Sequence, residues 1–339
     1  MWKLDPPSKD IIQWYKNAML PGLVKRVMNS GLPDDVKSIL LPAVIPLKRD
    51  ESELEGLLIE PPVESKQRQD RLMKLIESIP DYKYDPTLLV NLKQELVNVF
   101  DYEGQISKSQ SKSYYLTHRQ GRYTCTYCNR SYTITVVSRA QRTREHKIGK
   151  NDSERIARPH LDHWYDKADY PLLSLNIFNL IPSCPVCNSA VKGKTNFDVA
   201  THIHPYLTEK SEPDFKFRLE SNSEKNSDFP FIVGIDDSKS SVAERNTIRD
   251  LCLKEVYAYH GMLEAKDIYD WRIKNNYDYL KSLFSGALKK YHKTTEDIYR
   301  MFFGTEYIKD KNLDRPFSKL KRDILIQYGL LDENGNFIN

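Results

Sequence analysis

The sequence predicts an α+β fold: a mainly helical chain that carries a small central domain of turns and short strands. Two observations lead to this expectation. Apolar residues recur at helical spacing both before residue 104 and after about residue 238. Between these stretches, turn signals, cysteines and histidines concentrate, and the run at 132–137 is typical of a strand. We therefore expect three regions, at residues 1–104, 105–207 and 208–339.

Residues 1–104 are predicted to be mostly helical. Apolar side chains at helical spacing form three faces: Ile11, Ile12, Trp14, Tyr15 and Met19; Leu72, Leu75 and Ile76; and Leu88, Leu89, Leu92, Leu96 and Val99. A charged, proline-containing stretch at 46–67 is expected to be a connector between the first helices and the later ones. This region is a candidate for assembly or for docking a partner.

Residues 208–339 are predicted to form a short β-hairpin followed by helices. The segment F-K-F-R-L at 215–219 alternates like a strand, and residues 229–235 can pair with it. After a turn signal at 236–238, apolar residues at three- and four-residue spacing predict one long amphipathic helix with Ile248, Cys252, Val256, Tyr259 and Leu263 on a single face. Helical sequence continues to about Gly304, and a last helix is expected over 316–328.

The composition is that of a globular protein, with 339 residues of which 40% are hydrophobic and 29% charged. No apolar run approaches the roughly 18 residues that a membrane span needs. The N-terminal M-W-K-L-D-P-P-S-K lacks the apolar core of a signal peptide. Four of the five cysteines form closely spaced pairs, which favours a reducing, cytoplasmic location over disulfides. The fifth, Cys252, is expected to be a small buried apolar residue.

The two C-x-x-C pairs, Cys125/Cys128 and Cys184/Cys187, have the spacing of zinc knuckles. Together they provide the four thiolates of a tetrahedral site. The 55 residues between them, 129–183, exceed a simple zinc ribbon, so we expect a small inserted domain. Because four cysteines fill the coordination sphere of Zn²⁺, the ion is expected to be structural. The alternatives are disulfides or one coincidental pair.

The polar residues that the two pairs bracket can supply hydrolytic chemistry. Asp162, His163 and Asn179 lie between the pairs, and Asn188 follows the last cysteine directly. Cleavage of a phosphodiester needs an activated water and a cation on the phosphate oxygens. Histidine suits the base because its unperturbed pKa is near neutrality, and aspartate and asparagine oxygens suit Mg²⁺. Neighbouring strand residues point to opposite faces, so Asp162 and His163 can share a site only at a bend or strand end.

This ordered series resembles the HNH endonucleases, the zinc-ribbon-bearing branch of the ββα-metal nucleases. The strings L-D-H-W-Y-D-K-A-D-Y-P and F-N-L-I-P-S-C-P-V-C-N-S-A-V-K-G-K are similar to HNH proteins paired with ATPases in bacterial anti-phage systems such as Septu. The resemblance covers residues 123–206, about a quarter of the chain. It implies a ββα-metal nuclease domain clamped by the four-cysteine structural zinc, a catalytic Mg²⁺ or Mn²⁺, and products with a 5′-phosphate and a 3′-hydroxyl.

The resemblance also implies a role for each matching residue. His163 would deprotonate the attacking water, and Asp162 and Asn188 would ligate the catalytic cation. Asn179 would orient the His163 imidazole or hold its loop. The chain departs from the family three residues beyond the last asparagine, because Val191 stands where a lysine is usual.

The sequence does not assign a single role to four further residues. Lys192 directly follows Val191 and is one candidate for contacting phosphate. His160 precedes Asp162 by two positions and can share its strand face. His202 and His204 follow the second cysteine pair and either return to the catalytic ion or serve packing and solvent contact.

Positive charge is concentrated around this segment. The chain has a net charge of +4, whereas residues 104–160 carry twelve Lys and Arg against three Asp and Glu, a local charge of +9 that leaves −5 for the remainder. A basic stretch alone is often only a solvated surface. Beside a site that cuts phosphodiesters, it predicts a surface for nucleic acid.

We therefore expect a metal-dependent HNH endonuclease that acts on nucleic acid, with DNA favoured and RNA such as tRNA as the alternative. No nucleotide-binding motif is visible, so an ATPase partner in an anti-phage system is expected. The sequence also leaves open that the chain forms a homo-oligomer. A non-catalytic zinc-ribbon protein that binds nucleic acid, or an assembly scaffold with a vestigial nuclease, are the remaining alternatives.

Overall fold

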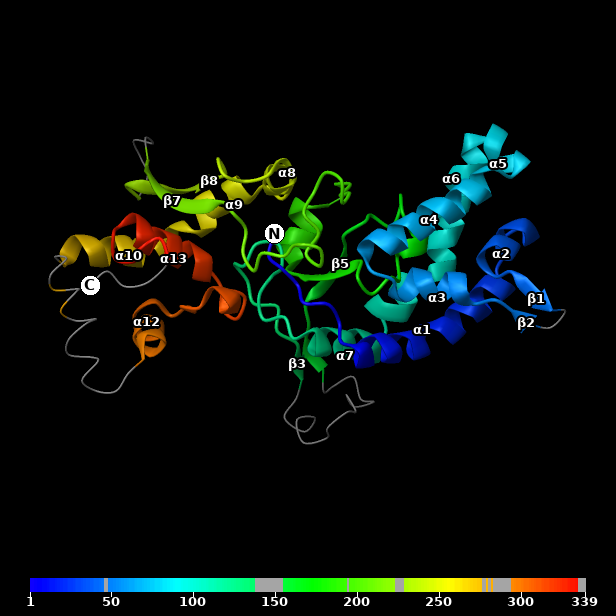
Figure 1. Cartoon of the computed structure of the whole chain (residues 1–339), viewed down its shortest axis with the longest axis horizontal. Helices are drawn as coiled ribbons and strands as arrows, with labels where there is room; N and C mark the ends of the chain where they lie inside the picture. Colours follow the sequence, from blue (N-terminus) through cyan, green and yellow to red (C-terminus); the bar gives the residue numbers. More distant parts are fainter. Residues whose placement is uncertain are drawn as a thin grey trace.

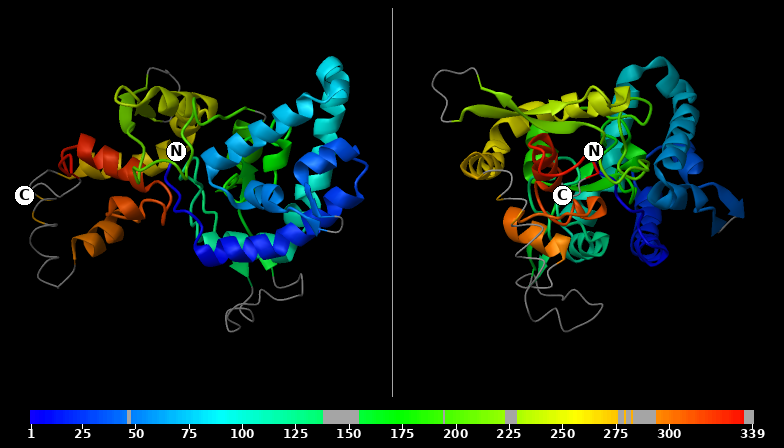
Figure 2. Two further views of the ribbon diagram at one scale, coloured as in Figure 1. Left: turned by 45° about the vertical axis from the view of Figure 1, so that its right-hand side comes forward. Right: turned by 60° about the vertical axis from the view of Figure 1, so that its left-hand side comes forward.

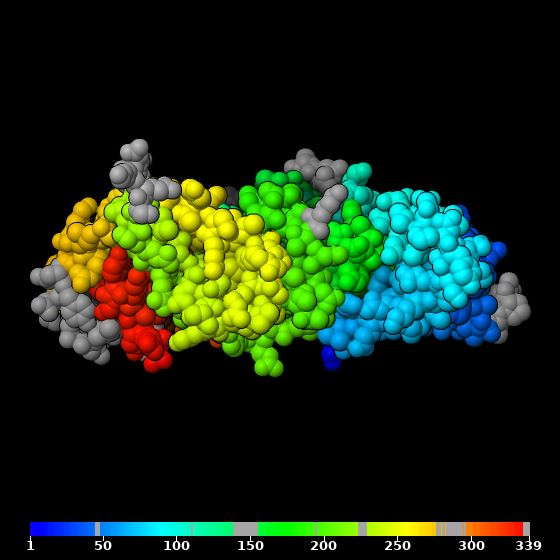
Figure 3. All heavy atoms as spheres, turned by 90° about the horizontal axis from the view of Figure 1, so that it is seen from above, coloured from blue at the N-terminus to red at the C-terminus, as the bar shows by residue number. Residues whose placement is uncertain are grey.

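The computed structural model describes residues 1–45, 48–137, 155–193, 195–222, 229–275 and 294–334, together with Tyr279 and Ser282. The molecule is elongated, and the chain largely follows its length (Figures 1 and 3). The early helices form one end, the late hairpin and helices form the other, and the segments from about residue 105 to 207 lie between them. Figure 2 shows the same order from two other directions. The described helices include none with the length and apolar character that a bilayer crossing requires.

The first region is helical, as predicted. It consists of α1 (Lys9–Asn29), α2 (Asp34–Leu40), the paired strands β1 (Ala43–Ile45) and β2 (Lys48–Arg49), then α3 (Ser52–Ile59), α4 (Pro62–Glu77), α5 (Pro80–Tyr84) and α6 (Pro86–Phe100). The predicted connector at 46–67 is wrong, because α3 and the start of α4 occupy most of it. Pro62 is the first residue of α4, a position where the missing N–H of proline costs no helical hydrogen bond. Leu75 and Leu88, predicted on apolar faces, are exposed.

The middle of the chain contains short elements. These are η1 (Glu103–Ser107), α7 (Gln110–Gln120), β3 (Val136–Val137), β4 (Arg155–Ala157), β5 (His160–His163), η4 (Pro171–Leu173), β6 (Leu180–Ser183) and η5 (Val186–Val191). Strand β5 pairs antiparallel with β6, which places Asp162 opposite Ile181. The strand predicted at 132–137 is shorter than expected: only β3 and an isolated bridge between Thr124 and Tyr132 form. After the second cysteine pair, where the resemblance to ββα-metal nucleases implies the α element, the chain forms a single π-helical segment, η5.

The last region contains the predicted hairpin, formed by β7 (Lys216–Ser221) and β8 (Phe231–Asp236) in an antiparallel register that pairs Phe217 with Ile235. The helices α8 (Val242–Asp250), α9 (Leu253–His260), α10 (Met262–Lys274), α12 (Thr295–Phe303), η8 (Lys309–Lys311) and α13 (Ser318–Gln327) follow. Helix α13 lies within the predicted 316–328. The helical sequence predicted at 276–293 lies, apart from Tyr279 and Ser282, outside the described residues.

The single long helix predicted after residue 238 is wrong. Cys252 has a φ of 44°, in the left-handed region, and separates α8 from α9. Such a residue ends the helical hydrogen-bond pattern and turns the next helix to a new direction. Ile248 is therefore buried, whereas Tyr259 and Leu263 are 71% and 68% exposed. Cys252 itself is exposed, which corrects its predicted burial.

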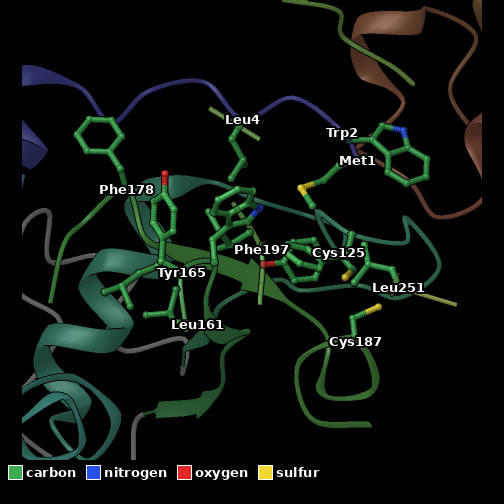
Figure 4. Packing of buried hydrophobic residues seen from close by; sticks show 14 of the residues in the cluster. Met1, Trp2, Leu4, Cys125, Leu161, Tyr165, Phe178, Cys187, Phe197 and Leu251 are labelled. Atoms are coloured by element: carbon green, nitrogen blue, oxygen red, sulfur yellow. The ribbon is translucent and has the colours of Figure 1, made fainter. Parts of the chain in front are cut away.

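Hydrogen bonds connect both the first and the last region to the middle of the chain. These hydrogen bonds hold the central loops in place. The Tyr15 hydroxyl donates to the carbonyl of Leu175 (2.7 Å), and the Ile177 N–H donates to the carbonyl of Leu58 (2.9 Å). From the other side, the Phe317 N–H donates to the carbonyl of Asn129 (2.9 Å). The buried apolar side chains form one cluster, and Figure 4 shows Cys125 and Cys187 at one side of it. The fold is thus mixed, with many helices and four two-stranded sheets among the described residues.

Candidate metal centre and active-site pocket

The four predicted zinc ligands come together in one buried cluster. The sulfur atoms of Cys125, Cys128, Cys184 and Cys187 all lie within 4.8 Å of one another, and none of the four forms a disulfide. Four sulfurs around a tetrahedral zinc, each about 2.3 Å from the ion, lie roughly 3.8 Å apart, so the cluster has the size of such a site. Within the described part of the chain, it is the one group of three or more His, Cys, Asp or Glu side chains close enough to hold a metal ion.

Backbone N–H groups donate hydrogen bonds to sulfurs of this cluster. The backbone N–H of Cys184 donates to Cys125 Sγ (3.3 Å), and the N–H of Arg130 donates to Cys128 Sγ (3.5 Å). A hydrogen bond with Cys125 is the main cause that lowers the pKa of Cys184 and of Cys128, whereas burial raises the pKa of Cys125 and hydrogen bonds with the other thiols raise that of Cys187. Because buried thiolates repel one another, a cation must balance their charge when all four ionise. The cluster can therefore hold a metal ion such as zinc.

The first knuckle is fixed from the C-terminal side. Asn129 follows Cys128 with a φ of 51°, a conformation that asparagine tolerates better than most residues. Its side-chain amide donates to the carbonyls of Asn312 (3.1 Å) and Arg315 (3.3 Å). The hydroxyl of Tyr257 in α9 donates to the carbonyl of Cys128. The knuckle therefore cannot shift without disturbing these C-terminal contacts.

A pocket of about 310 Å³ lies beside β5 and η5. Its lining consists of Tyr102, Glu103, Ser107, Arg158, His160, Leu161, Asp162, His163, Asp166, Lys167, Asn188, Lys192 and Gly193. Three of the four predicted catalytic residues, Asp162, His163 and Asn188, thus line one pocket. His163 is the last residue of β5, and the chain bends directly after it. Because the strand ends here, the neighbours Asp162 and His163 can both face the same site, which is the condition expected from the sequence.

Asp162 is buried, with 5% of its surface exposed, and one of its oxygens carries two contacts. Asp162 Oδ2 accepts a hydrogen bond from the hydroxyl of Tyr127 (2.5 Å) and lies 3.3 Å from Lys192 Nζ. Burial raises the pKa of the carboxyl to about 6, against the opposing effect of the Lys192 ammonium. Burial, aided by the Asp162 charge, also raises the pKa of the Tyr127 phenol, which therefore keeps its proton and donates.

The His163 ring is held in one tautomer. Its Nε2 lies 2.9 Å from the carbonyl oxygen of Ser174, and because a carbonyl only accepts, Nε2 carries the proton. The edge of the Tyr102 ring packs on the imidazole, with centroids 4.3 Å apart. Burial lowers the pKa of His163 to about 3, so the ring is neutral near pH 7. The unprotonated Nδ1 is then free to accept a proton.

Asn188 lies in η5 and completes one side of the pocket. Its Nδ2 donates to His160 Nδ1 (3.2 Å) and to Ser189 Oγ (3.3 Å). Its carbonyl Oδ1 has no hydrogen-bond partner among the described residues. An aspartate oxygen and an amide oxygen at one pocket are donors that a hard divalent cation accepts, with water completing its shell. Asp162 and Asn188 therefore fit such a cation, although they form a smaller protein ligand set than the four cysteines.

Asn179 is buried and does not line the pocket. Its side-chain oxygen accepts from the Tyr165 N–H (2.7 Å), and its Nδ2 donates to the carbonyls of Tyr165 (3.1 Å) and Leu173 (3.0 Å). Leu173 precedes Ser174, the residue that holds the His163 ring. Of the two roles considered for Asn179, these contacts match the one that holds the loop.

Several residues that line the pocket or contact its lining were not predicted from the sequence. Tyr127 had a signal, since an aromatic residue inside a C-x-x-C pair is fixed in place by the knuckle. Arg158, two residues before His160, donates to the carbonyls of Ser107 (3.0 Å) and Pro159 (2.9 Å) and forms no ion pair within the described part of the chain. Tyr102 lies in a helical stretch and gave no signal.

The other polar residues singled out from the sequence lie away from the pocket or outside the described residues. His202 Nε2 pairs with Asp250 (2.9 Å) and its ring stacks on Phe197. His204 packs against Trp164, with ring centroids 4.4 Å apart. Neither returns to the pocket. Much of the basic stretch, at 138–154, lies outside the described residues.

The chain was also compared with known proteins. No protein-family model, curated protein or solved structure matches it. A function for this chain must therefore be argued from the pocket and the cysteine cluster themselves.

Proposed function

We propose that this chain is a metal-dependent endonuclease of the HNH type that hydrolyses phosphodiester bonds in nucleic acid, with DNA as the favoured substrate. The observation that carries the proposal is the meeting of Asp162, His163 and Asn188 at one pocket. Two of them lie on β5, and the third lies in η5 directly after the cysteine cluster. This arrangement combines a base with oxygen ligands, as hydrolysis of a phosphodiester requires.

His163 is the general base of this proposal. The carbonyl of Ser174 binds Nε2–H, so Nδ1 accepts the proton of the attacking water. The low pKa of the ring keeps this nitrogen unprotonated near neutral pH. Such a low pKa also weakens the base, since general bases act best with a pKa near the working pH. An anionic phosphate entering the pocket favours the imidazolium and raises the pKa toward that range.

Asp162 and Asn188 hold the divalent cation of the proposed reaction. When bound, Mg²⁺ or Mn²⁺ supplies positive charge to the non-bridging and leaving oxygens of the phosphate. The short contact of Lys192 with Asp162 keeps the carboxylate ionised in a buried place, because the ammonium opposes the effect of burial on its pKa. The ion of the four-cysteine cluster has a structural role, since four thiolates leave it no open coordination position.

Arg158 supports a nucleic-acid substrate. Its guanidinium lines the pocket and forms no ion pair with any described residue, so none of the described carboxylates neutralises its charge. Arginine donors of this kind bind phosphate oxygens. Carbonyls of Ser107 and Pro159 hold the side chain at the pocket. The arginine therefore suits a phosphate next to the one that is cut.

The proposal is tested by cleavage assays with purified wild-type protein, His163→Ala and the control His118→Ala. His118 is an exposed histidine outside the pocket. Supercoiled DNA, single-stranded DNA and structured RNA are each incubated with Mg²⁺ or Mn²⁺. Because a general base contributes roughly 10²- to 10⁴-fold, His163→Ala should lose at least about a hundredfold in rate while His118→Ala cuts like wild type.

The outcomes separate the alternatives. Equal cleavage by wild type and His163→Ala would show that the proposed mechanism is wrong. Binding of nucleic acid without cleavage under every condition would indicate the non-catalytic zinc-ribbon protein, and cleavage of RNA alone would change the substrate. The family resemblance extends the proposal to an ATPase-paired anti-phage effector. For this reason each assay is repeated with the ATPase encoded beside the gene, where one exists.

A further inference from the structure

Tyr127 lies inside the first cysteine knuckle, but its side chain ends at Asp162, a residue that lines the pocket. Its backbone is placed between Cys125 and Cys128, and its ring has no exposed surface (0%). The hydroxyl donates to Asp162 Oδ2 at 2.5 Å. One residue of the structural metal centre therefore hydrogen-bonds the carboxylate to which we assign the catalytic cation.

The backbone around Tyr127 cannot adjust freely. The preceding Thr126 donates twice to the carbonyl of Pro182 in β6, from Oγ1 (2.8 Å) and from its N–H (3.4 Å). Pro182 pairs with Leu161, the neighbour of Asp162 in β5. The phenol is thus held at a fixed place relative to the strand that carries Asp162.

The two carboxylate oxygens of Asp162 differ in their contacts. Oδ2 receives the Tyr127 hydrogen bond and the Lys192 contact, whereas Oδ1 makes no hydrogen bond to any described residue. Asp162 lines the pocket, so a cation there can be bound through an oxygen that receives no hydrogen bond from the described part of the chain. Partners that orient a ligating carboxylate typically change metal affinity by 10- to 100-fold.

We propose that Tyr127 is a positioning residue that holds Asp162 Oδ2 and thereby orients the carboxylate for the divalent cation. This inference rests on the proposed function for the identity of the cation site. It also assigns the four-cysteine centre a second effect: by fixing the knuckle, it fixes a ligand of the other metal ion. The phenol keeps its proton throughout and takes part in no bond-breaking step.

The test uses Tyr127→Phe, which keeps the ring and removes only the hydroxyl. Mn²⁺ binding to the free protein is measured by electron paramagnetic resonance, without nucleic acid, for wild type, Asp162→Asn and Tyr127→Phe. We expect Asp162→Asn to lose the site and Tyr127→Phe to bind Mn²⁺ about 10-fold more weakly. In cleavage assays, raising the Mn²⁺ concentration should restore the rate of Tyr127→Phe but not that of Asp162→Asn.

Tyr257→Phe is the matched control. It also removes a buried hydroxyl that binds this knuckle, but one that contacts Cys128 rather than Asp162. The hydrogen bonds of Thr126 to Pro182 and of Asn129 to Asn312 still hold the knuckle in this variant, so its Mn²⁺ affinity should equal that of wild type, and zinc content should be the same in all variants. Unchanged Mn²⁺ affinity in Tyr127→Phe, equal weakening in both phenylalanine variants, or loss of zinc from Tyr127→Phe would each overturn the inference. Normal Mn²⁺ results in a protein that cleaves nothing would instead refute the proposed nuclease and leave the positioning role standing.

Discussion

The side chain of Asn179 and the backbone of Tyr165 hydrogen-bond each other in both directions. Asn179 Oδ1 accepts from the Tyr165 N–H at 2.7 Å, and Asn179 Nδ2 donates to the Tyr165 carbonyl at 3.1 Å. The same Nδ2 reaches the carbonyl of Leu173, next to the residue that binds the His163 ring. One buried amide therefore holds the chain both just after β5 and at the end of η4.

Asn179→Ala should lower both stability and activity. It leaves the Tyr165 carbonyl and N–H without partners in a buried place, and each such group costs about 1–3 kcal/mol, while the Leu173 carbonyl keeps only the Asn176 N–H (3.0 Å). We expect a loss of about 3 kcal/mol in the free energy of unfolding, measured with urea, and a lower kcat because Ser174 no longer fixes His163. The control Asn98→Ala removes an exposed amide in α6 and should change stability by less than about 0.5 kcal/mol. Equal stability of the two variants would refute the loop-holding role.

Arg158→Ala should weaken nucleic-acid binding in a salt-dependent manner. Binding is measured on the His163→Ala background, so that the substrate stays intact. Each phosphate contact contributes about 0.9 to the slope of log affinity against log salt, and the variant should lose about one unit of slope. Arg71→Ala is the control, because Arg71 is exposed and paired with Glu53. An unchanged slope in Arg158→Ala would show that Arg158 does not contact the phosphates of the bound nucleic acid.

Cys187→Ser should abolish stoichiometric zinc binding and unfold the centre of the molecule. Structural zinc sites contribute about 10–16 kcal/mol in small peptides, which exceeds the stability of most domains. Zinc is measured by mass spectrometry of the purified protein, and folding by limited proteolysis. The matched variant Cys252→Ser changes the exposed cysteine outside the cluster and should retain zinc and protease resistance. Full zinc content in Cys187→Ser would contradict the four-cysteine site.

His204→Phe should make stability less sensitive to acid. Burial lowers the pKa of His204 to about 3, whereas an unfolded histidine has a pKa near 6.5. Its contribution to stability is therefore present above pH 6.5 and lost as pH falls toward 3, because the unfolded chain takes up the proton first. At pH 5.5 the loss is about 1.4 kcal/mol.

The phenylalanine keeps the packing on Trp164 but cannot titrate. It also loses the hydrogen bond from the Tyr206 N–H (3.2 Å), so the two proteins are compared by the change in unfolding free energy between pH 7.0 and 5.5, not by absolute stability. Because about 0.2 kcal/mol is already lost at pH 7.0, the change should be smaller in the variant by about 1.2 kcal/mol. Identical changes in both proteins would show that His204 titrates normally in the folded state.

The sequence predicted those features that depend on short-range patterns. Paired cysteines at knuckle spacing predicted a four-sulfur cluster, and the alternation at 215–219 predicted the β7–β8 hairpin. The predictions of helix boundaries failed at prolines and at a residue with a left-handed backbone conformation. Prolines at 61 and 62 suggested a connector but begin α4, and a left-handed Cys252 divided a stretch whose apolar spacing indicated one helix.

The sequence by itself determined which residues offer chemistry: four thiols in two pairs, and Asp162, His163, Asn179 and Asn188 in order between and after them. Only the tertiary structure decided how they meet. The end of β5 lets Asp162 and His163 share a pocket, and η5 brings Asn188 to it, while Asn179 remains in the loop behind. Contacts between residues far apart in the chain, such as Tyr127 with Asp162, depend on how strands and knuckles pack, and no local pattern encodes that packing.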